Sequence, residues 1–347
     1  MQKFWKNKKV LITGHTGFKG SWLSLILLQL GSKVHGISLK EKKNSLFNIM
    51  QIKRSLISNN YCDINNQKKL TKLILKIKPE IVFHFAAQSI VSISYKSPLE
   101  TIETNILGTS NVLNSLKVCK SVKTVIVASS DKCYDSYSNK SYVETDRLGG
   151  DDIYSASKAC TEIVTSAFRK TFYNKRKIKL ASVRAGNVIG GGDYSKDRIF
   201  PDVIKAYFSK NYCIVRNKNF TRPWQHVLDP LSGYLKLAMK LHTKNNKLYQ
   251  SAWNFGPNYK SKKVYDLVKE IQTIIPIKLR YSNKNNKINE TKYLGLNSSK
   301  AKKYLDWKPK ISFKETVRLT VSWYINQKNK VKLKEIIENQ INIIIKK

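Results

Sequence analysis

The stretch KVLITGHTGFKGSWLSLILLQL, residues 9–30, decides the fold of this chain. An apolar run over residues 10–12 predicts a short strand, and glycines then recur at every third position, at Gly14, Gly17 and Gly20. The apolar segment that follows predicts a helix. Glycines permit a tight turn and leave room for backbone N–H groups to contact phosphate at the N-terminus of that helix. The stretch therefore predicts a turn that binds the pyrophosphate of a dinucleotide.

Strands and helices alternate downstream of this turn. We predict strands at 33–39, 56–62, 81–85, 124–128 and 180–184, and helices at 65–77, 98–118 and 154–172. The run IVFHF, residues 81–85, is typical of a parallel strand covered on both faces. The alternating order predicts an α/β fold with a doubly wound parallel sheet, the Rossmann architecture.

The sequence changes in character after Ala185. Clustered glycines at 186 and 190–192 and scattered prolines interrupt the alternating pattern. We therefore predict a dinucleotide-binding domain over residues 1–185 and a smaller mixed substrate domain over residues 186–347, with some segments returning to the first domain. The sequence of residues 336–347 predicts a terminal helix.

The net charge is strongly positive, because 64 lysines and arginines stand against 23 acidic residues and give +41. Such a charge often indicates nucleic-acid binding, but the lysines here are spread along the chain instead of gathered on one helix. We interpret them as a solvated surface and expect no nucleic-acid partner. A positive field would still attract an anionic nucleotide-sugar.

Neither a membrane nor a metal partner is indicated. No apolar segment reaches the roughly 18 residues that a membrane-spanning helix needs, and no apolar leader follows the basic N-terminus. The five cysteines are scattered without a CxxC pair, so they support neither a disulfide framework nor a zinc site. We expect a cytoplasmic protein with reduced thiols and no bound metal.

Tyr154 and Lys158 carry the chemistry that the sequence indicates. They stand four positions apart at the start of a predicted helix, so they share one face. A free tyrosine has a pKa near ~10, and a neighbouring ammonium group lowers that pKa by favouring the phenolate. The phenolate can accept a proton from a sugar hydroxyl while hydride leaves the same carbon for a nicotinamide cofactor.

Two loops add candidates because each follows a predicted strand, at the sheet edge where ligands bind. The serine of SDK, residues 130–132, can hydrogen-bond the same sugar hydroxyl, and AAQ, residues 86–88, has small side chains that allow a ligand to approach closely. After the second strand, the acid that usually binds the adenosine ribose is replaced by Lys40 with Glu41 beside it, so both NAD and NADP remain open.

Five strings in this order, TGHTGFKG, HFAAQS, TNILGT, SSDKCY and YSASK, resemble the extended short-chain dehydrogenase/reductase family. Within it, GHTGFKGSWLS, SSDKCYD, SVRAGNVIGGGD and RPWQHVLDPLSGY are similar to the CDP-glucose 4,6-dehydratases. The chain departs from that pattern at Lys40, where those enzymes tend to have Asp.

The resemblance implies dehydration of CDP-glucose, or of a similar nucleotide-sugar, with NAD recycled on the enzyme. Sugar carbon 4 is oxidised, water is eliminated across carbons 5 and 6, and hydride returns to carbon 6. The product would be CDP-4-keto-6-deoxyglucose, a precursor of O-antigen dideoxy sugars. Family members commonly form homodimers through paired helices, here those that follow Pro98 and Tyr154.

The resemblance also implies roles for the catalytic residues. Tyr154 would be the base of the oxidation, with Lys158 as its partner and ribose ligand and Ser130 as a hydroxyl donor. Asp131 would protonate the departing hydroxyl. Lys132 stands where many nucleotide-sugar 4,6-dehydratases have Glu as the base at carbon 5, so it either takes that role or stabilises the enolate while another group removes the proton.

The remaining assignments are sets of ligands. The predicted cofactor-binding residues are Gly14, His15, Thr16, Gly17, Phe18, Gly20, Asp63, Ile64, Ala86, Ala87, Gln88, Asn105, Tyr154 and Lys158. The predicted substrate-binding residues are Gln88, Ser130, Asn187, Arg198 and Arg222, of which Arg222 suits a bidentate contact with the diphosphate. We interpret four further residues as core or loop anchors: His84, Trp224, His226 and Trp253.

Other functions share parts of this pattern. Another nucleotide-sugar 4,6-dehydratase, a UDP-sugar 4-epimerase or a decarboxylase of the same family would keep the glycine turn and the Tyr–Lys pair. An epimerase or decarboxylase needs no acid to expel a hydroxyl, so Asp131 favours the dehydratase. A cofactor-binding regulatory protein with an inactive site is disfavoured by the intact Ser130, Tyr154 and Lys158.

Overall fold

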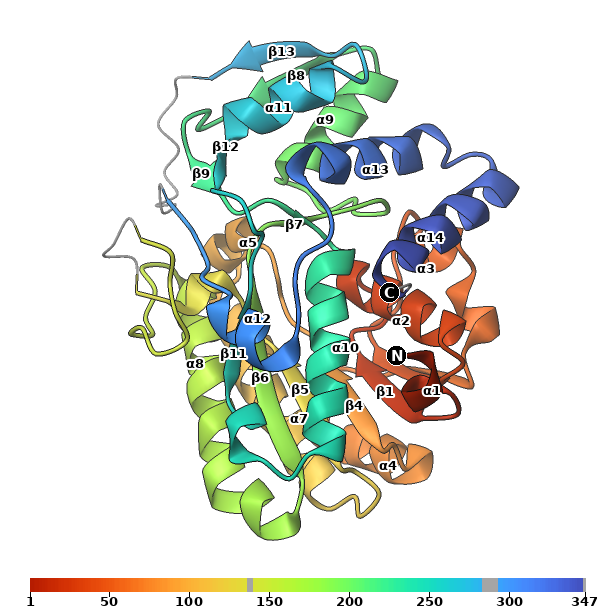
Figure 1. The fold of residues 1–347 in the computed structure, drawn as a ribbon, viewed down its shortest axis with the longest axis vertical. Helices are drawn as coiled ribbons and strands as arrows, with labels where there is room; N and C mark the ends of the chain where they lie inside the picture. Colours follow the sequence, from red (N-terminus) through yellow and green to blue (C-terminus); the bar gives the residue numbers. More distant parts are fainter. Residues whose placement is uncertain (136–139, 283–292, 346–347) are drawn as a thin grey trace.

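The computed structural model describes residues 1–135, 140–282 and 293–345. At its centre is a seven-stranded sheet in the order β11-β6-β5-β4-β1-β2-β3, in which every pair of neighbours is parallel (Figure 1). The strands are β1 Lys9–Thr13, β2 Lys33–Ser38, β3 Ser58–Tyr61, β4 Ile81–His84, β5 Thr124–Ala128, β6 Lys179–Ala185 and β11 Ala252–Phe255. From β1 the chain continues to β2 and β3 on one side, and from β4 it continues to β5 and β6 on the other side. The carboxyl ends of β1 and β4 therefore form the topological switch point, where ligands bind in such sheets. The predicted doubly wound parallel sheet is confirmed.

Both faces of the sheet are covered. Side chains along β1 alternate between two buried layers, because Val10 and Ile12 belong to one apolar cluster and Leu11 belongs to the other. Helices α2 (Phe18–Gln29) and α10 (Leu228–Thr243) supply the first layer, and α4 (Gln67–Ile77) and α7 (Gly108–Lys117) supply the second. A strand buried on both faces is apolar at nearly every position, which explains the run at residues 81–85.

The predicted helices are present, and two of them contain a π turn. The helix predicted at 98–118 consists of α6 Pro98–Ile102, the π turn η2 Glu103–Leu107 and α7 in direct succession. The helix predicted at 154–172 consists of α8 Ile153–Phe168 and the π turn η4 Arg169–Tyr173. Such turns are often found at functional sites, and η2 contains Asn105.

The chain after β6 lies largely beyond the carboxyl edge of the sheet (Figure 1). The elements there are β7 Val188–Ile189, α9 Ile199–Phe208, β8 Tyr212–Val215, β9 Thr221–Arg222, β10 Gln225–His226, β12 Lys262–Lys263, α11 Val264–Gln272, β13 Lys278–Tyr281 and α13 Phe313–Ile325. Helices α10, α12 (Ser299–Leu305) and α14 (Lys330–Ile345) also follow β6 but pack beside the sheet. Strand β11 returns to pair with β6. The domain division at residues 185 and 186 stays a prediction.

The terminal helix begins earlier than predicted, at Lys330 instead of residue 336. It contacts α10 and α13, and Leu333, Ile337 and Ile341 are buried in the first apolar layer. The remaining short elements are α1 Gln2–Trp5, α3 Leu46–Ile49, η1 Ile52–Ser55, α5 Val91–Lys96, η3 Asp131–Cys133, η5 Asn174–Arg176 and η6 Lys247–Tyr249.

Within the described ranges, no helix combines the length and the hydropathy needed to cross a membrane. In the same ranges, no group of three or more His, Cys, Asp or Glu side chains could hold a metal ion. All five cysteines are free thiols, and four of them are buried.

Candidate active site

The glycine turn between β1 and α2 has the geometry of a phosphate cradle. Gly14 has a φ of +76°, and a Cβ there would lie 2.6 Å from the backbone nitrogen of Ala86. A Cβ on Gly20 would lie 2.2 Å from the carbonyl oxygen of Gly14. Gly17 is the N-cap of α2, so no capping side chain competes with an anion for the N–H groups of the first turn. The turn fits the pyrophosphate of a dinucleotide.

Two side chains of this turn serve the scaffold. The buried ring of His15 packs against Gly36, and its Nε2 lies 2.5 Å from Asn59 Oδ1. Thr16 Oγ1 donates to the carbonyl of Leu39 at 3.1 Å. Contacts of His15 and Thr16 with the cofactor stay predictions.

Phe18 stands at the other end of the turn. Its ring is half-buried, and a Cβ on Gly190 would lie 3.3 Å from the ring carbon Cζ. The glycine cluster that follows β6 thus packs directly against the turn that follows β1.

Asn105 and Gln88 hold the loop that follows β4. The Asn105 amide accepts from the Gln88 N–H at 2.9 Å and donates to the Gln88 carbonyl at 3.0 Å and to Ser157 Oγ at 2.9 Å. The Gln88 amide in turn accepts from the Ile90 N–H at 2.6 Å and donates to Thr101 Oγ1 at 2.9 Å. These contacts fix the loop and its half-buried Ala86 and Ala87 against α8, and direct ligand contacts by the two amides stay predictions.

The ends of β2 and β3 lie where the adenosine ribose is expected. Lys40 is exposed, whereas the carboxylate of Glu41 accepts a hydrogen bond from the Tyr61 hydroxyl at 2.7 Å. Asp63 is exposed and its Oδ1 accepts from a backbone N–H, while Ile64 is buried. Glu41 therefore offers a carboxylate one position after the place where dinucleotide-binding folds usually have the acid that binds the adenosine ribose.

Tyr154 lies in the first turn of α8 and faces Ser130. Its side chain is 7% exposed. Burial raises the pKa of Tyr154 to about 12, although a hydrogen bond with the Ser130 side chain and the charge of Arg198 oppose the rise. The Ser130 hydroxyl also donates to Asp131 Oδ1 at 3.1 Å and accepts from the Lys132 N–H at 3.2 Å. The structure thus brings the phenol, the serine and the SDK turn together.

The expectation that Lys158 lowers the pKa of Tyr154 stays a prediction. The main groups that lower it are Ser130 and Arg198. Lys158 is buried one helical turn further on, where burial and the charge of Lys19 lower its own pKa to about 8. A four-residue spacing puts two side chains on one helix face, but it does not fix how closely their polar ends approach.

Asp131 is a buried carboxyl group. Burial raises its pKa, although the cations Lys132, Arg222 and Lys19 oppose the rise. Among the described residues its Oδ2 has no hydrogen-bond partner, and a Cβ on Gly186 would lie 2.8 Å from it. A carboxyl group with a raised pKa keeps its proton more readily, which suits a general acid that acts on a ligand.

Two arginines approach this site from the chain after β6. Arg222 on β9 is 5% exposed, and its charge reaches Asp131. Arg198 forms a 2.9 Å ion pair with Asp193, and its charge reaches Tyr154. Together they place positive charge beside Asp131 and Tyr154, and their contact with a diphosphate stays a prediction.

Lys19 is a cation of the site that the sequence prediction missed. It is half-buried in the first turn of α2. Burial and the charge of Arg198 lower its pKa to about 8, whereas Asp131 acts in the opposite direction. The sequence signal that could have identified Lys19 is its position in GFKG, between two glycines of the phosphate-binding turn.

The residues interpreted as anchors are buried. The two ring nitrogens of His84 lie 2.6 Å from Thr13 Oγ1 and 3.0 Å from Thr109 Oγ1, so its place in the core is confirmed. Trp224, His226 and Trp253 are also buried. Asn187 is half-buried, and its backbone carbonyl accepts from the N–H of Gln225 at 3.1 Å. A contact of the Asn187 side chain with substrate stays a prediction.

Known proteins match the chain over most of its length. A family model described as GDP-mannose 4,6 dehydratase matches residues 11–320. The chain is 42% identical over 335 residues to the CDP-glucose 4,6-dehydratase of Salmonella typhimurium (strain LT2), which covers 93% of this chain and 92% of that protein.

Solved structures share the fold. The dTDP-glucose 4,6-dehydratase of Bacillus anthracis in complex with NAD has a TM-score of 0.75 at 23% identity, covering 94% of this chain and 99% of that one. The UDP-glucuronic acid 4-epimerase of Bacillus cereus in complex with UDP-glucuronic acid and NAD has a TM-score of 0.77 at 22% identity, covering 92% and 98%. At these identities the two structures establish the shared architecture.

Proposed function

The chain belongs to the GDP-mannose 4,6-dehydratase family within the extended short-chain dehydrogenases/reductases, and from this premise we propose that it is a CDP-glucose 4,6-dehydratase. It would convert CDP-glucose to CDP-4-keto-6-deoxyglucose and water. The observation that carries the proposal is the 42% identity to the Salmonella enzyme over 93% of this chain. On the resemblance alone, we place the reaction in the cytoplasm and in O-antigen biosynthesis.

NAD is the proposed cofactor, and the residues of the glycine turn fit it. Gly14 and Gly20 let the turn pack closely against neighbouring backbone, and the N-terminus of α2 favours the negative charge of a pyrophosphate. Glu41 is available to the adenosine ribose, and Lys158 to the nicotinamide ribose. When bound, NAD would supply the reversible hydride acceptor that the oxidation of sugar carbon 4 and the later reduction of carbon 6 require.

The protein's own residues move the protons. Tyr154 would accept the proton of the hydroxyl on carbon 4 as a phenolate, a form that Ser130, Arg198 and the positive nicotinamide ring of bound NAD favour against the effect of burial. The Ser130 hydroxyl would hydrogen-bond the same oxygen. Asp131 donates a proton to the hydroxyl that leaves carbon 6. A carboxyl group with a raised pKa supports this division of roles.

The diphosphate and the enolate need positive charge. Arg198 and Arg222 are assigned to the diphosphate. Lys132, half-buried beside Asp131, is assigned to stabilising the enolate that forms when carbon 5 loses its proton. The group that removes that proton is unassigned, because a lysine is a poor base unless it is desolvated.

The proposal predicts the mass of the product. Incubation with CDP-glucose should yield a nucleotide-sugar lighter than the substrate by one water, as measured by mass spectrometry. A panel of ADP-, CDP-, GDP-, UDP- and dTDP-glucose, each tested with NAD and with NADP, separates CDP-glucose from other substrates and tests the influence of Lys40. An isomer of unchanged mass would instead support the epimerase alternative.

We propose further that the enzyme is a homodimer, and exposed apolar side chains on neighbouring helices support this. Leu99 on α6, Leu107 in η2 and Ile163 on α8 are 71%, 53% and 58% exposed, and α6 packs against α8. Large apolar groups exposed on adjacent elements often mark a protein interface.

The double variant Leu99→Glu, Ile163→Glu is therefore expected to halve the mass measured by size-exclusion chromatography with light scattering, because buried carboxylates oppose association. Val331→Glu on α14 is the control, since Val331 is 83% exposed and lies outside these helices. A wild-type monomer, or a double variant that remains dimeric, would contradict this interface.

A further inference from the structure

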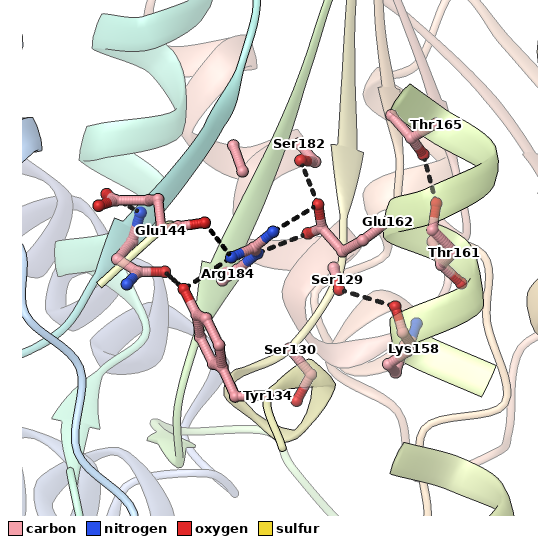
Figure 2. A network of polar contacts seen from close by, with 12 residues as sticks. Ser129, Ser130, Tyr134, Glu144, Lys158, Thr161, Glu162, Thr165, Ser182 and Arg184 are labelled. Carbon is pink, nitrogen blue, oxygen red and sulfur yellow. Dashed lines mark hydrogen bonds and ion pairs between the residues drawn. The ribbon is translucent and has the colours of Figure 1, made fainter. Parts of the chain in front are cut away.

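A buried cluster around Arg184 lies behind the site (Figure 2). Arg184 is 3% exposed, and its Nε and Nη2 donate to the two carboxylate oxygens of Glu162 at 2.9 and 3.0 Å. Its Nη1 donates to the Tyr134 hydroxyl at 2.7 Å. The Ser182 hydroxyl donates to Glu162 at 2.6 Å, and the Tyr134 hydroxyl donates to Asn254 Oδ1 at 2.7 Å. We call these five residues the Arg184 cluster.

The cluster brings two elements of the site together on strand β6, which carries both Ser182 and Arg184. Glu162 lies on α8 one helical turn beyond Lys158, which itself lies one turn beyond Tyr154. Tyr134 directly follows η3, the turn that contains Asp131 and Lys132. The cluster therefore joins the helix that carries the proposed base to the turn that carries the proposed acid.

Aromatic contacts fix the direction of the Tyr134 ring. It is stacked on Tyr142, with ring centroids 4.8 Å apart and planes at 6°, and the guanidinium carbon of Arg184 lies 4.8 Å from its centroid. Asn254 ties the same hydroxyl to β11. Tyr134 is thus held by its ring and by its hydroxyl, and the chain three positions earlier is Asp131.

The ion pair between Arg184 and Glu162 is better explained by the positions it fixes than by a contribution to the stability of the fold. A buried ion pair often contributes no more to stability than an apolar pair of equal volume, because both charges lose their hydration. A guanidinium group, however, has N–H donors in fixed directions, so one side chain can bind a carboxylate and a phenol at defined angles.

We propose that Arg184 is a positioning residue, which through Glu162 fixes helix α8 and through Tyr134 fixes the turn η3. The fixed relation between α8 and η3 sets the separation of the proposed base and the proposed acid. This inference rests on the proposed function, because it assigns both groups to one reaction.

The test removes one hydroxyl group from the cluster. Tyr134→Phe keeps the stacked ring but loses the hydrogen bonds with Arg184 and Asn254. Tyr173→Phe is the matched control, because the buried Tyr173 hydroxyl donates to the Leu113 carbonyl at 2.7 Å in the second apolar layer. Both variants should lose a similar amount of thermal stability, as measured by the Tm.

The two variants should differ in catalysis. For Tyr134→Phe we expect kcat for CDP-glucose to fall roughly 10- to 100-fold with KM unchanged, since small displacements of reacting groups have effects of that size. Tyr173→Phe should leave kcat and KM unchanged. If Tyr134→Phe matches Tyr173→Phe in kcat, the positioning role is overturned.

A charge variant gives an independent readout. Glu162 raises the pKa of Lys158 against the larger effect of burial, so Glu162→Gln lowers the pH at which Lys158 loses its proton. The alkaline limb of the kcat–pH profile should therefore move to lower pH in Glu162→Gln and stay in place in Tyr134→Phe. A shift in neither variant, or in both, would contradict the arrangement.

Amide hydrogen exchange separates this inference from the proposed function. Peptides covering residues 130–135 should exchange faster in Tyr134→Phe than in Tyr173→Phe, without any substrate. If the wild-type protein does not convert CDP-glucose, the proposed function fails and exchange alone decides. Faster exchange then supports the positioning role, and unchanged exchange overturns it.

Discussion

Replacing Tyr154 with phenylalanine is expected to lower kcat by roughly 10²- to 10⁴-fold, the usual contribution of a positioned general base. The phenol of Tyr154 is the proposed acceptor of the carbon-4 proton, and it faces Ser130 and lies within the field of Arg198. Phenylalanine fills the same volume, so the Kd of CDP-glucose should change by less than about tenfold, the equivalent of one hydrogen bond. Stopped-flow turnover and calorimetric binding measure the two quantities.

The control for this variant is Tyr173→Phe, which removes a buried tyrosine hydroxyl in η4, the turn that follows the far end of α8 from Tyr154. It should bind and turn over the nucleotide-sugar as the wild type does. Turnover by Tyr154→Phe close to that of the control would remove Tyr154 from the role of base. Loss of binding together with turnover would show that the hydroxyl acts on the substrate before any chemistry.

The architecture could be predicted because its signals are local. A strand buried on both faces is apolar at successive positions, and Ile81–Phe85 shows this without any knowledge of its neighbours. The glycines at positions 14 and 20 indicate that two backbone segments approach each other closely, and in the structure a Cβ on either residue would collide with the main chain.

The direction of individual side chains could not be predicted. His15 and Asn105 lie inside the strings that carry the family resemblance, yet their side chains contact the protein itself. A motif gives the position of a residue along the chain, and only the packed fold decides which way its side chain points. The same limit hid the pair of Glu162 and Arg184, which come from separate elements.

The electrostatics of the site needed the fold as well. The sequence offered Lys158 as the cation nearest to Tyr154, because helical spacing was the only distance available. In the folded chain the charge that lowers the pKa of Tyr154 comes from Arg198, which follows β6 and lies far from Tyr154 in sequence. Burial, which has the larger effect on this group, has no local sequence signal at all.

Asp131→Asn is expected to stop the reaction after the oxidation of carbon 4 and before the elimination of water. Asparagine has the same shape and cannot release an acidic proton, so dehydration should slow by roughly 10²- to 10⁴-fold. Oxidation at carbon 4 depends on Tyr154 and Ser130 and should continue. The absorbance of reduced nicotinamide should therefore rise in a single turnover and persist, and mass spectrometry should find little product that has lost water.

The matched control is Asp229→Asn, because Asp229 is also a buried carboxyl group, whose pKa burial raises to about 7, and it binds the backbone N–H groups of Lys310 and Ile311. It should lose stability without accumulating reduced nicotinamide, since it takes no part in the site. If Asp131→Asn slows oxidation and dehydration equally, the carboxyl group positions the Ser130 hydroxyl and another group must be the acid. If it slows neither step, the carboxyl group of Asp131 has no chemical role, and the distinction between dehydratase and epimerase loses its structural support.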